Sequence, residues 1–177
     1  MKNQLAKQID QTIENIPNFP IARVQFKDIS PLFLNPELYK KVVKAFADFS
    51  RGKVDVVCGL ESRGYLFGVS IAAELNVPFV LVRKKGKLPP PVIGQSYALE
   101  YGTAEIEMRE GQIQPGQRVL IHDDLLATGG TAAAATHLIE KQGGIVAQYS
   151  FLIELFELHG RGKLKKEEVE LLSLTGY

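Results

Sequence analysis

Short apolar runs alternate with amphipathic segments along most of the chain. Four runs are rich in β-branched residues and bounded by Gly, Pro or charged residues, which is typical of strands. The segments between them repeat apolar residues at helical spacing, as in PELYKKVVKAFADF, where Leu38, Val42, Phe46 and Phe49 share one helical face. The pattern predicts strands at 54–58, 77–82, 119–122 and 145–153, and helices at 36–49, 64–75 and 131–144.

This alternation indicates an α/β fold with a mostly parallel central sheet flanked by helices on both faces. Helices of this length between successive strands form right-handed crossovers, which place the strands parallel to one another. A chain of 177 residues suits a single domain with one core. Ligands of such sheets bind beyond the carboxyl ends of the strands, so we expect the functional residues there.

Two segments interrupt the alternation. Residues 83–101 contain four cations and three consecutive prolines, which excludes a helix and favours a long mobile loop. The following TAEIEMRE alternates apolar and polar side chains, as the returning arm of a two-stranded hairpin would. We therefore interpret residues 83–109 as a mobile flap. Residues 1–35, which include Pro17, Pro20 and Pro31, are expected to form a hood over the sheet.

Composition excludes several classes of function. The formal net charge is +1, so no global field attracts the chain to nucleic acid or to a membrane surface. No apolar run approaches the roughly 20 residues of a membrane span, and the polar N-terminus is unlike a secretory leader. We expect a cytoplasmic protein. The single cysteine, Cys58, lies in the apolar run VDVVCGL and is expected to be a small buried residue.

The segment VLIHDDLLATGGT, residues 119–131, carries the clearest chemical signal. Its two glycines allow a tight turn with inward-pointing N–H groups, its threonines add hydroxyl donors, and the following helix contributes its positive end. Residues 127–131 are therefore predicted to form a phosphate-binding turn, the cradle. Asp123 and Asp124, the acid pair, would repel a bare phosphate, so the ligand should also bring hydroxyl donors or a divalent cation. A sugar phosphate meets both requirements, because it has hydroxyl groups at one end and a phosphate at the other.

A simpler interpretation treats the acid pair as helix capping and the glycines as an ordinary turn. Similarly, His122 directly before the acid pair is interpreted as a packed or hydrogen-bonded residue rather than a metal ligand.

The same segment resembles the 5-phosphoribosyl-1-pyrophosphate (PRPP) signature of the type I phosphoribosyltransferases. FKDISPLF, GLESRGYLFG, VRKKGKLP and SYALEYG also occur in the order and spacing of the adenine-specific members of that family, over roughly residues 15–155. The resemblance implies the type I phosphoribosyltransferase fold and transfer of the phosphoribosyl group of PRPP to adenine, giving AMP and pyrophosphate in purine salvage. It also implies Mg²⁺ that accompanies the pyrophosphate, and a homodimer.

The resemblance further implies roles for individual residues. The acid pair would hold the ribose hydroxyls. The cradle for the 5-phosphate would consist of Ala127, Thr128, Gly129, Gly130 and Thr131. Pyrophosphate would be bound by residues at the start of the helix after the first strand and at the start of the flap, namely Ser62, Arg63, Gly64, Arg83, Lys84 and Lys87.

At the base, Glu100 in LEYG would manage the proton of the purine, and Tyr101 would pack over the reaction centre, with Arg63 as a further catalytic group. Adenine would lie between Phe26 and Leu125, with main-chain contacts around Lys27. Without the resemblance, Glu100 reads as a solvent-facing residue and Phe26 equally well as a core aromatic.

The magnesium ion would be held by the phosphates of PRPP, and the acid pair would be its nearest carboxylates. We therefore assign no strict set of protein ligands. Three alternatives remain. A sister transferase for hypoxanthine, guanine or xanthine would keep the acid pair and the cradle but lack FKDI and LEYG. A PRPP-sensing regulator would need a nucleic-acid-binding surface, of which the sequence has no sign. A structural module would use the turn only as a helix cap.

Overall fold

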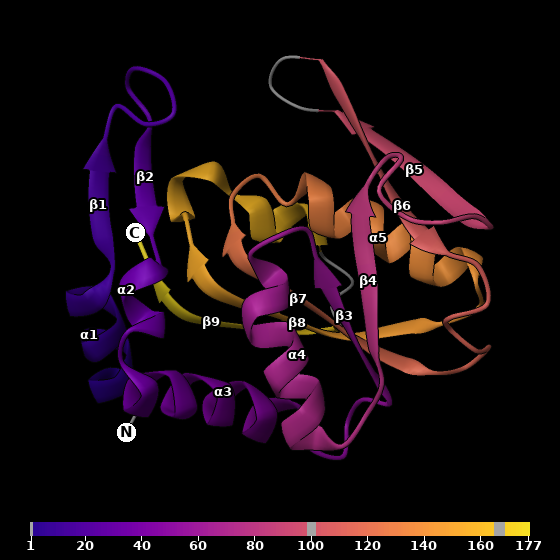
Figure 1. Ribbon diagram of the computed structural model, residues 1–177, viewed down its shortest axis with the longest axis horizontal. Helices are drawn as coiled ribbons and strands as arrows, with labels where there is room; N and C mark the ends of the chain where they lie inside the picture. Colours follow the sequence, from indigo (N-terminus) through magenta and orange to yellow (C-terminus); the bar gives the residue numbers. More distant parts are fainter. Residues whose placement is uncertain (1, 99–101, 165–168) are drawn as a thin grey trace.

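A seven-stranded sheet forms the centre of the computed structural model, which describes residues 2–98, 102–164 and 169–177 (Figure 1). The strand order is β5-β6-β4-β3-β7-β8-β9; neighbours from β4 to β9 are parallel, whereas β6 runs antiparallel to both β4 and β5. This is the predicted mostly parallel sheet. Its strands are β3 (Val56–Leu60), β4 (Phe79–Lys84), β5 (Val92–Ala98), β6 (Thr103–Arg109), β7 (Arg118–Leu126), β8 (Ile145–Glu154) and β9 (Glu170–Gly176).

The three predicted crossover helices are present. Asn35 caps the first of them by accepting a hydrogen bond from the N–H of Leu38, and Pro36 occupies its first turn, where a missing N–H costs nothing. The third helix ends before the Gly143-Gly144 pair. The helices are α1 (Lys2–Thr12), α2 (Ser30–Phe33), α3 (Pro36–Ser50), α4 (Gly64–Leu75) and α5 (Gly130–Lys141), with 3₁₀ turns η1 (Phe156–Leu158) and η2 (Gly160–Leu164).

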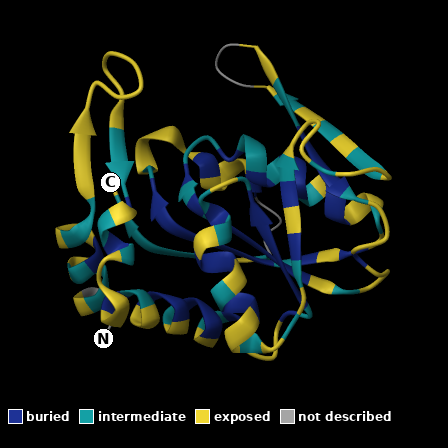
Figure 2. Ribbon diagram, in the orientation of Figure 1, coloured by how far each residue is buried: buried dark blue, intermediate teal, exposed yellow. Residues whose placement is uncertain are grey.

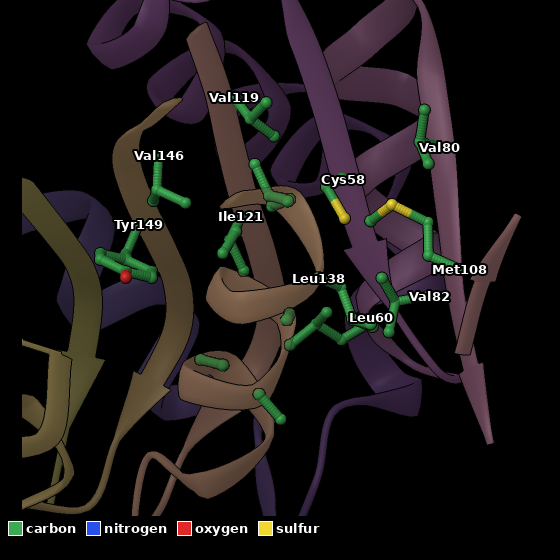
Figure 3. Packing of buried hydrophobic residues seen from close by; sticks show 14 of the residues in the cluster. Cys58, Leu60, Val80, Val82, Met108, Val119, Ile121, Leu138, Val146 and Tyr149 are labelled. Atoms are coloured by element: carbon green, nitrogen blue, oxygen red, sulfur yellow. The ribbon is translucent and has the colours of Figure 1, made fainter. Parts of the chain in front are cut away.

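Two apolar clusters cover the two faces of the sheet, because alternate strand residues point to opposite sides. On β3, Cys58 and Leu60 face the cluster under α5 (Figure 3), whereas Val57 faces the cluster under α3 and α4. Burial raises the pKa of the Cys58 thiol to about 12, so this residue is the expected small buried group. The predicted face of α3 is buried at Leu38, Val42 and Phe46 and half-buried at Phe49.

Strand β7 is longer than the apolar run predicted. It continues through the acid pair to Leu126, because Asp123 and Leu125 still pair with Phe151 and Ile153 of β8. On its other side, the ladder with β3 ends at His122. The acid pair therefore lies on a strand end supported from one side only, rather than in the loop after the strand.

The flap prediction needs one correction. Residues 92–98 form strand β5, so the expectation of a loop over all of 83–101 was wrong. The prolines end at residue 91, and from Val92 to Ala98 the chain pairs with β6 as a regular antiparallel hairpin. The returning arm was predicted correctly. Residues 99–101 lie outside the described part of the chain.

The N-terminal 35 residues contain a second, separate hairpin. Strands β1 (Glu14–Pro17) and β2 (Gln25–Asp28) pair antiparallel, and this hairpin stands on the opposite side of the molecule from β5 and β6 (Figure 1). It is largely exposed, whereas the central strands are buried (Figure 2). The C-terminal segment forms the edge strand β9. Among the described helices, none has the length and apolar character to cross a bilayer.

His122 shows how tightly the inner strands are packed. The side chain is fully buried, its Nδ1 lies 2.8 Å from the Ser150 hydroxyl, and its ring meets the Phe46 ring edge-on at 4.8 Å. It is thus a packed, hydrogen-bonded residue, as interpreted from the sequence. Burial lowers its pKa to about 3, because the charged imidazolium would lose its hydration.

This histidine should make the protein less stable in mild acid. As the pH falls below 6.5, the ordinary pKa of histidine, His122 becomes protonated in the unfolded chain but stays neutral in the folded chain down to about pH 3. The free energy of unfolding therefore decreases as the pH falls from neutral. Between about pH 7.5 and about pH 5.5, the free energy of unfolding of the wild type should fall by about 1 kcal/mol more than that of His122→Asn. Urea unfolding of both proteins at each pH measures the difference, and other titrating groups cancel in the comparison. Parallel pH dependences would contradict the prediction.

Candidate functional site

A cavity of about 330 Å³ opens where the carboxyl ends of β3, β4 and β7 meet. It is mostly polar and combines three acidic and two basic side chains, which is unusual for an ordinary surface depression. The sequence-predicted residues from three separate segments thus come together as the fold requires. The lining residues are Glu61, Ser62, Arg63, Lys84, Asp123, Asp124 and Leu125.

The acid pair forms the negative wall of this cavity. Asp123 Oδ1 accepts a hydrogen bond of 2.9 Å from the N–H of Asp124, and Asp124 Oδ2 lies 2.8 Å from Arg63 Nη2 as an ion pair. Burial raises the pKa of Asp123 well above its ordinary value, and the neighbouring charge of Asp124 raises it further. Burial also raises the pKa of Asp124, although Arg63 opposes the shift. The pair therefore has less positive charge around it than two carboxylates require, and a ligand with cations or hydroxyl donors would supply the difference.

Glycine at position 64 allows the β3–α4 turn to approach the acid pair closely. A Cβ atom there would lie 2.8 Å from the His122 carbonyl oxygen and 2.9 Å from Asp123 Oδ1, closer than real contacts allow. The turn before it contains a cis peptide between Glu61 and Ser62. Helix α4 begins at Gly64, directly after the cavity residues Ser62 and Arg63, so its positive end lies beside the cavity and is suited to an anion.

Arg63 connects the acid pair to the N-terminal hairpin. Besides the ion pair with Asp124, its Nη1 donates a hydrogen bond of 3.3 Å to the Lys27 carbonyl oxygen. Its guanidinium carbon lies 4.9 Å from the centre of the Phe26 ring, a cation–π contact. Phe26 and Lys27 do not line the cavity themselves but contact Arg63, which does.

Glu61 organises the basic residues on the opposite side, a role that the sequence analysis did not predict. Its carboxylate accepts hydrogen bonds from the Lys84 N–H at 2.6 Å and from Arg83 Nη2 at 3.3 Å. Burial opposes ionisation of Glu61, but the Lys84 N–H and the Arg83 side chain outweigh it and lower its pKa. Arg83 also donates to the Lys87 carbonyl oxygen at 3.0 Å. Of these three cations, Lys84 lines the cavity, whereas Arg83 turns to Glu61 and the side chain of Lys87 is exposed.

The cradle follows Leu126 directly and leads into α5. Gly129 has φ of +76°, a conformation that glycine adopts without strain, and it is the N-terminal cap of α5. A Cβ atom there would also lie 2.5 Å from the Gly160 carbonyl oxygen. The first N–H groups of α5 have no acceptor within the helix, and the helix dipole makes them favourable for an anion. Ala127, Thr128, Gly130 and Thr131 complete the turn beside them, each half-buried.

Residues 154–161 support the cradle from behind, which was not foreseen from the sequence. Gly160 packs against the Ala127 carbonyl oxygen and the Gly129 nitrogen. Its neighbour Arg161 donates from Nε to Glu154 at 3.0 Å, and that bond lowers the pKa of Glu154. The motif HGRGK was the available signal, since a glycine beside a charged residue after a strand often marks close backbone contact.

Two predicted residues cannot be placed. Glu100 and Tyr101 lie outside the described residues, so their proposed roles rest on the sequence alone.

Comparisons with known proteins identify the family of this chain. Residues 30–173 match the phosphoribosyl transferase domain family. An adenine phosphoribosyltransferase of Caenorhabditis elegans is 48% identical, covering 99% of this chain and 95% of the relative. The crystal structure of an adenine phosphoribosyltransferase from Rhodothermus marinus superposes with a TM-score of 0.93 at 44% identity, covering 99% of both chains.

A second solved structure contains ligands. The adenine phosphoribosyltransferase of Saccharomyces cerevisiae, complexed with an imino-altritol bisphosphate and adenine, has a TM-score of 0.90 at 40% identity, covering 97% of this chain and 99% of the yeast chain. Sequence identity at this level, over nearly the whole length of both compared chains, shows membership of the same family and not only a shared fold. This chain belongs to the adenine phosphoribosyltransferases, within the phosphoribosyltransferase family.

Proposed function

We propose that this protein transfers the phosphoribosyl group of PRPP to adenine, yielding AMP and pyrophosphate in purine salvage. The observation that carries the proposal is the acid pair, whose raised pKa values indicate a shortage of positive charge, and which only Leu125 and Leu126 separate from a glycine turn at a helix N-terminus. A ligand with a polar diol at one end and a phosphate at the other matches both parts.

The reaction breaks the bond between the anomeric carbon and pyrophosphate, forms a bond to a purine nitrogen, and releases the proton of that nitrogen. Positive charge develops on the sugar during this exchange. In our proposal, Asp123 and Asp124 hold the ribose hydroxyls, and their negative charge favours the developing cation. The cradle, residues 127–131, holds the 5-phosphate and so fixes the sugar relative to the base.

Pyrophosphate would bind at the positive side of the cavity. Ser62, Arg63 and Gly64 would supply donors at the start of α4, and Lys84 lines the same cavity as Ser62 and Arg63. Arg83 and Lys87 would contribute from the same segment. The support is the placement of Lys84 by Glu61, which accepts its N–H at 2.6 Å.

Adenine would lie between Phe26 and Leu125, with Lys27 contributing main-chain groups. Support comes from Arg63, which lies over the Phe26 ring at 4.9 Å and reaches the Lys27 carbonyl oxygen. The guanidinium covers an aromatic face in the same way that a flat base would. Binding of the base then requires Arg63 to move away from Phe26, which frees it for pyrophosphate.

We also propose Mg²⁺ as a companion of PRPP. The described residues contain no group of three or more His, Cys, Asp and Glu side chains that could hold a metal on their own. The acid pair nevertheless fits a cation shared with the substrate, because burial leaves its two carboxyl groups short of positive charge. Mg²⁺ bound there would neutralise the leaving pyrophosphate.

Glu100 is proposed to accept the proton of the purine, with Tyr101 packed over the reaction centre; both assignments come from the LEYG motif. We further propose a homodimer in the cytoplasm. In support of the dimer, Leu66 and Val69, one turn apart on α4, are 47% and 52% exposed, and an apolar patch of this kind is suited to a subunit contact. Phosphorylated substrates, which do not cross membranes unaided, support the location.

The choice of base tests the proposed function directly. With PRPP and Mg²⁺ present, adenine should be converted to its nucleotide with a kcat/KM at least about a hundredfold above that of guanine, hypoxanthine or xanthine, because a site that hydrogen-bonds one exocyclic group leaves buried groups unpaired with another. Nucleotide formation from labelled bases measures this. A preference for guanine or hypoxanthine would contradict the assignment.

Removing charge from the acid pair should weaken PRPP binding. Asp124→Asn should raise the Kd for Mg²⁺–PRPP about tenfold to a hundredfold, since a hydrogen bond to a charged group contributes about 1.5–3 kcal/mol. Calorimetry measures the Kd. Asp55→Asn is the matched control, because Asp55 also pairs with an arginine, Arg118, but precedes β3 at the opposite end of the sheet. Unchanged affinity in Asp124→Asn would place the ribose elsewhere.

Glu100→Ala should separate chemistry from binding. Loss of a proton acceptor is expected to lower kcat about a hundredfold or more while the Kd for PRPP changes less than about threefold. Steady-state kinetics with calorimetry distinguishes the two effects. Glu100→Gln serves as the isosteric comparison. Full turnover in both variants would remove the proton role from this residue.

A further inference from the structure

Strand β5 of the flap contacts the cradle through a residue that has no role so far. Tyr97 is one residue from the end of β5, and its hydroxyl oxygen accepts a hydrogen bond of 3.2 Å from the Thr131 hydroxyl. Its ring packs against the first residue of α5: a Cβ atom on Gly130 would lie 3.2 Å from Tyr97 Cδ2. Glycine at position 130 therefore allows the tyrosine to lie directly on the start of the helix.

A second contact holds the same two elements together further along. Lys141 at the end of α5 donates to Gln95 Oε1 at 2.9 Å and to the Gly94 carbonyl oxygen at 3.3 Å. Strand β5 is thus attached to α5 near both helix ends, and Tyr97 lies at the end that carries the phosphate-binding N–H groups. Within the described part of the β5–β6 hairpin, the Tyr97 hydroxyl makes a hydrogen bond to a cradle side chain, that of Thr131.

We propose that Tyr97 is a positioning residue for the 5-phosphate, and that an occupied cradle strengthens the attachment of β5 to α5. The inference rests on the proposed function of the cradle. Each hydroxyl has one proton, and a phosphate oxygen can only accept. When the Thr131 hydroxyl donates to the phosphate, it no longer donates to the Tyr97 oxygen. Thr131 Oγ1 can then accept a hydrogen bond from the Tyr97 hydroxyl.

The hydrogen-bond chain must then run from the Tyr97 O–H to Thr131 Oγ1, and from the Thr131 O–H to the phosphate. A hydroxyl that donates to an anion is a better acceptor, so the Tyr97 bond should shorten from its present 3.2 Å, which is long for a pair of hydroxyls. Tyr97 in return holds the Thr131 rotamer that faces the phosphate. By linkage, the phosphate and the position of β5 favour each other.

Tyr97→Phe tests this, because it keeps the ring on Gly130 and removes the hydroxyl. The Kd values for ribose 5-phosphate and for PRPP should both rise about threefold to tenfold, as expected for one hydrogen bond. The Kd for pyrophosphate, which has no 5-phosphate, should stay within about twofold. Calorimetry with each ligand gives the three values. A merely structural role would weaken all three ligands together, and that outcome, like no change at all, would overturn the proposal.

Tyr149→Phe is the matched control. Tyr149 on β8 makes the same kind of contact with the same helix, its hydroxyl 2.7 Å from that of Thr136, but one turn and more beyond the cradle. This variant should leave the Kd for ribose 5-phosphate unchanged. An equal loss in both variants would mean that any tyrosine–threonine contact on α5 matters, which would overturn the specific role of Tyr97.

Thr131→Val separates this proposal from the assignment of the cradle. If Thr131→Val weakens ribose 5-phosphate and Tyr97→Phe does not, the cradle assignment stands and the proposal for Tyr97 fails. If Thr131→Val has no effect either, the assignment of the Thr131 hydroxyl to the phosphate fails, and the proposal for Tyr97 fails with it. Should both act through one chain of hydrogen bonds, the double variant will lose no more affinity than Thr131→Val alone; multiplied losses would overturn the proposal.

Discussion

The carboxylates of the acid pair, Asp124 buried and Asp123 half-buried, are the constraint around which the site is arranged. They lie on adjacent residues of β7, where the ladder to β3 has ended and the ladder to β8 continues. Burial raises the pKa of both, and among the described residues the cation paired with Asp124 is Arg63. Such an arrangement is costly for the folded chain alone and becomes favourable when a ligand contributes hydroxyl donors or a metal cation.

The other parts of the site follow from keeping this pair accessible. The β3–α4 turn can pass beside Asp123 because residue 64 is glycine, and it brings the start of α4 to the cavity. Arg63 in the same turn joins the acid pair to Phe26 in the N-terminal hairpin. Arg63 thus contacts both the proposed sugar site and the proposed base site. A ligand that binds at either site would alter the contacts of the same guanidinium.

The sequence predicts those features of the fold that arise from local patterns. Helix α4 was predicted with its observed bounds, because its apolar residues are enclosed by Gly64 and by Asn76 in the left-handed conformation. The full length of β7 was not predictable, since Asp123 and Asp124 disfavour a strand locally and it is pairing with β8 that extends it. Strand β5 was not predicted for the same reason. Its strand conformation depends on pairing with β6, whereas the prolines before it suggest a loop.

For the site, the predictable part is the set of residues within each motif, and the missing part is how motifs support one another. Glu61 was read only as part of GLESRG, yet it organises Arg83 and Lys84, more than twenty residues away. Gly160 and Arg161 lie outside the motifs of the family resemblance, yet Gly160 packs against the cradle and Arg161 beside it pairs with Glu154. These roles depend on contacts between distant segments, which a residue pattern along the chain does not contain.

The glycines of the cradle illustrate why such contacts limit the choice of sequence. Gly129 is needed twice, because its φ is positive and because Gly160 lies against it. Gly130 has an ordinary helical conformation, and the ring of Tyr97 is what limits its side chain. The pair therefore serves two neighbours, the segment after β8 on one side and strand β5 on the other. A phosphate-binding turn alone would explain the first glycine; the second is explained by the close approach of the flap.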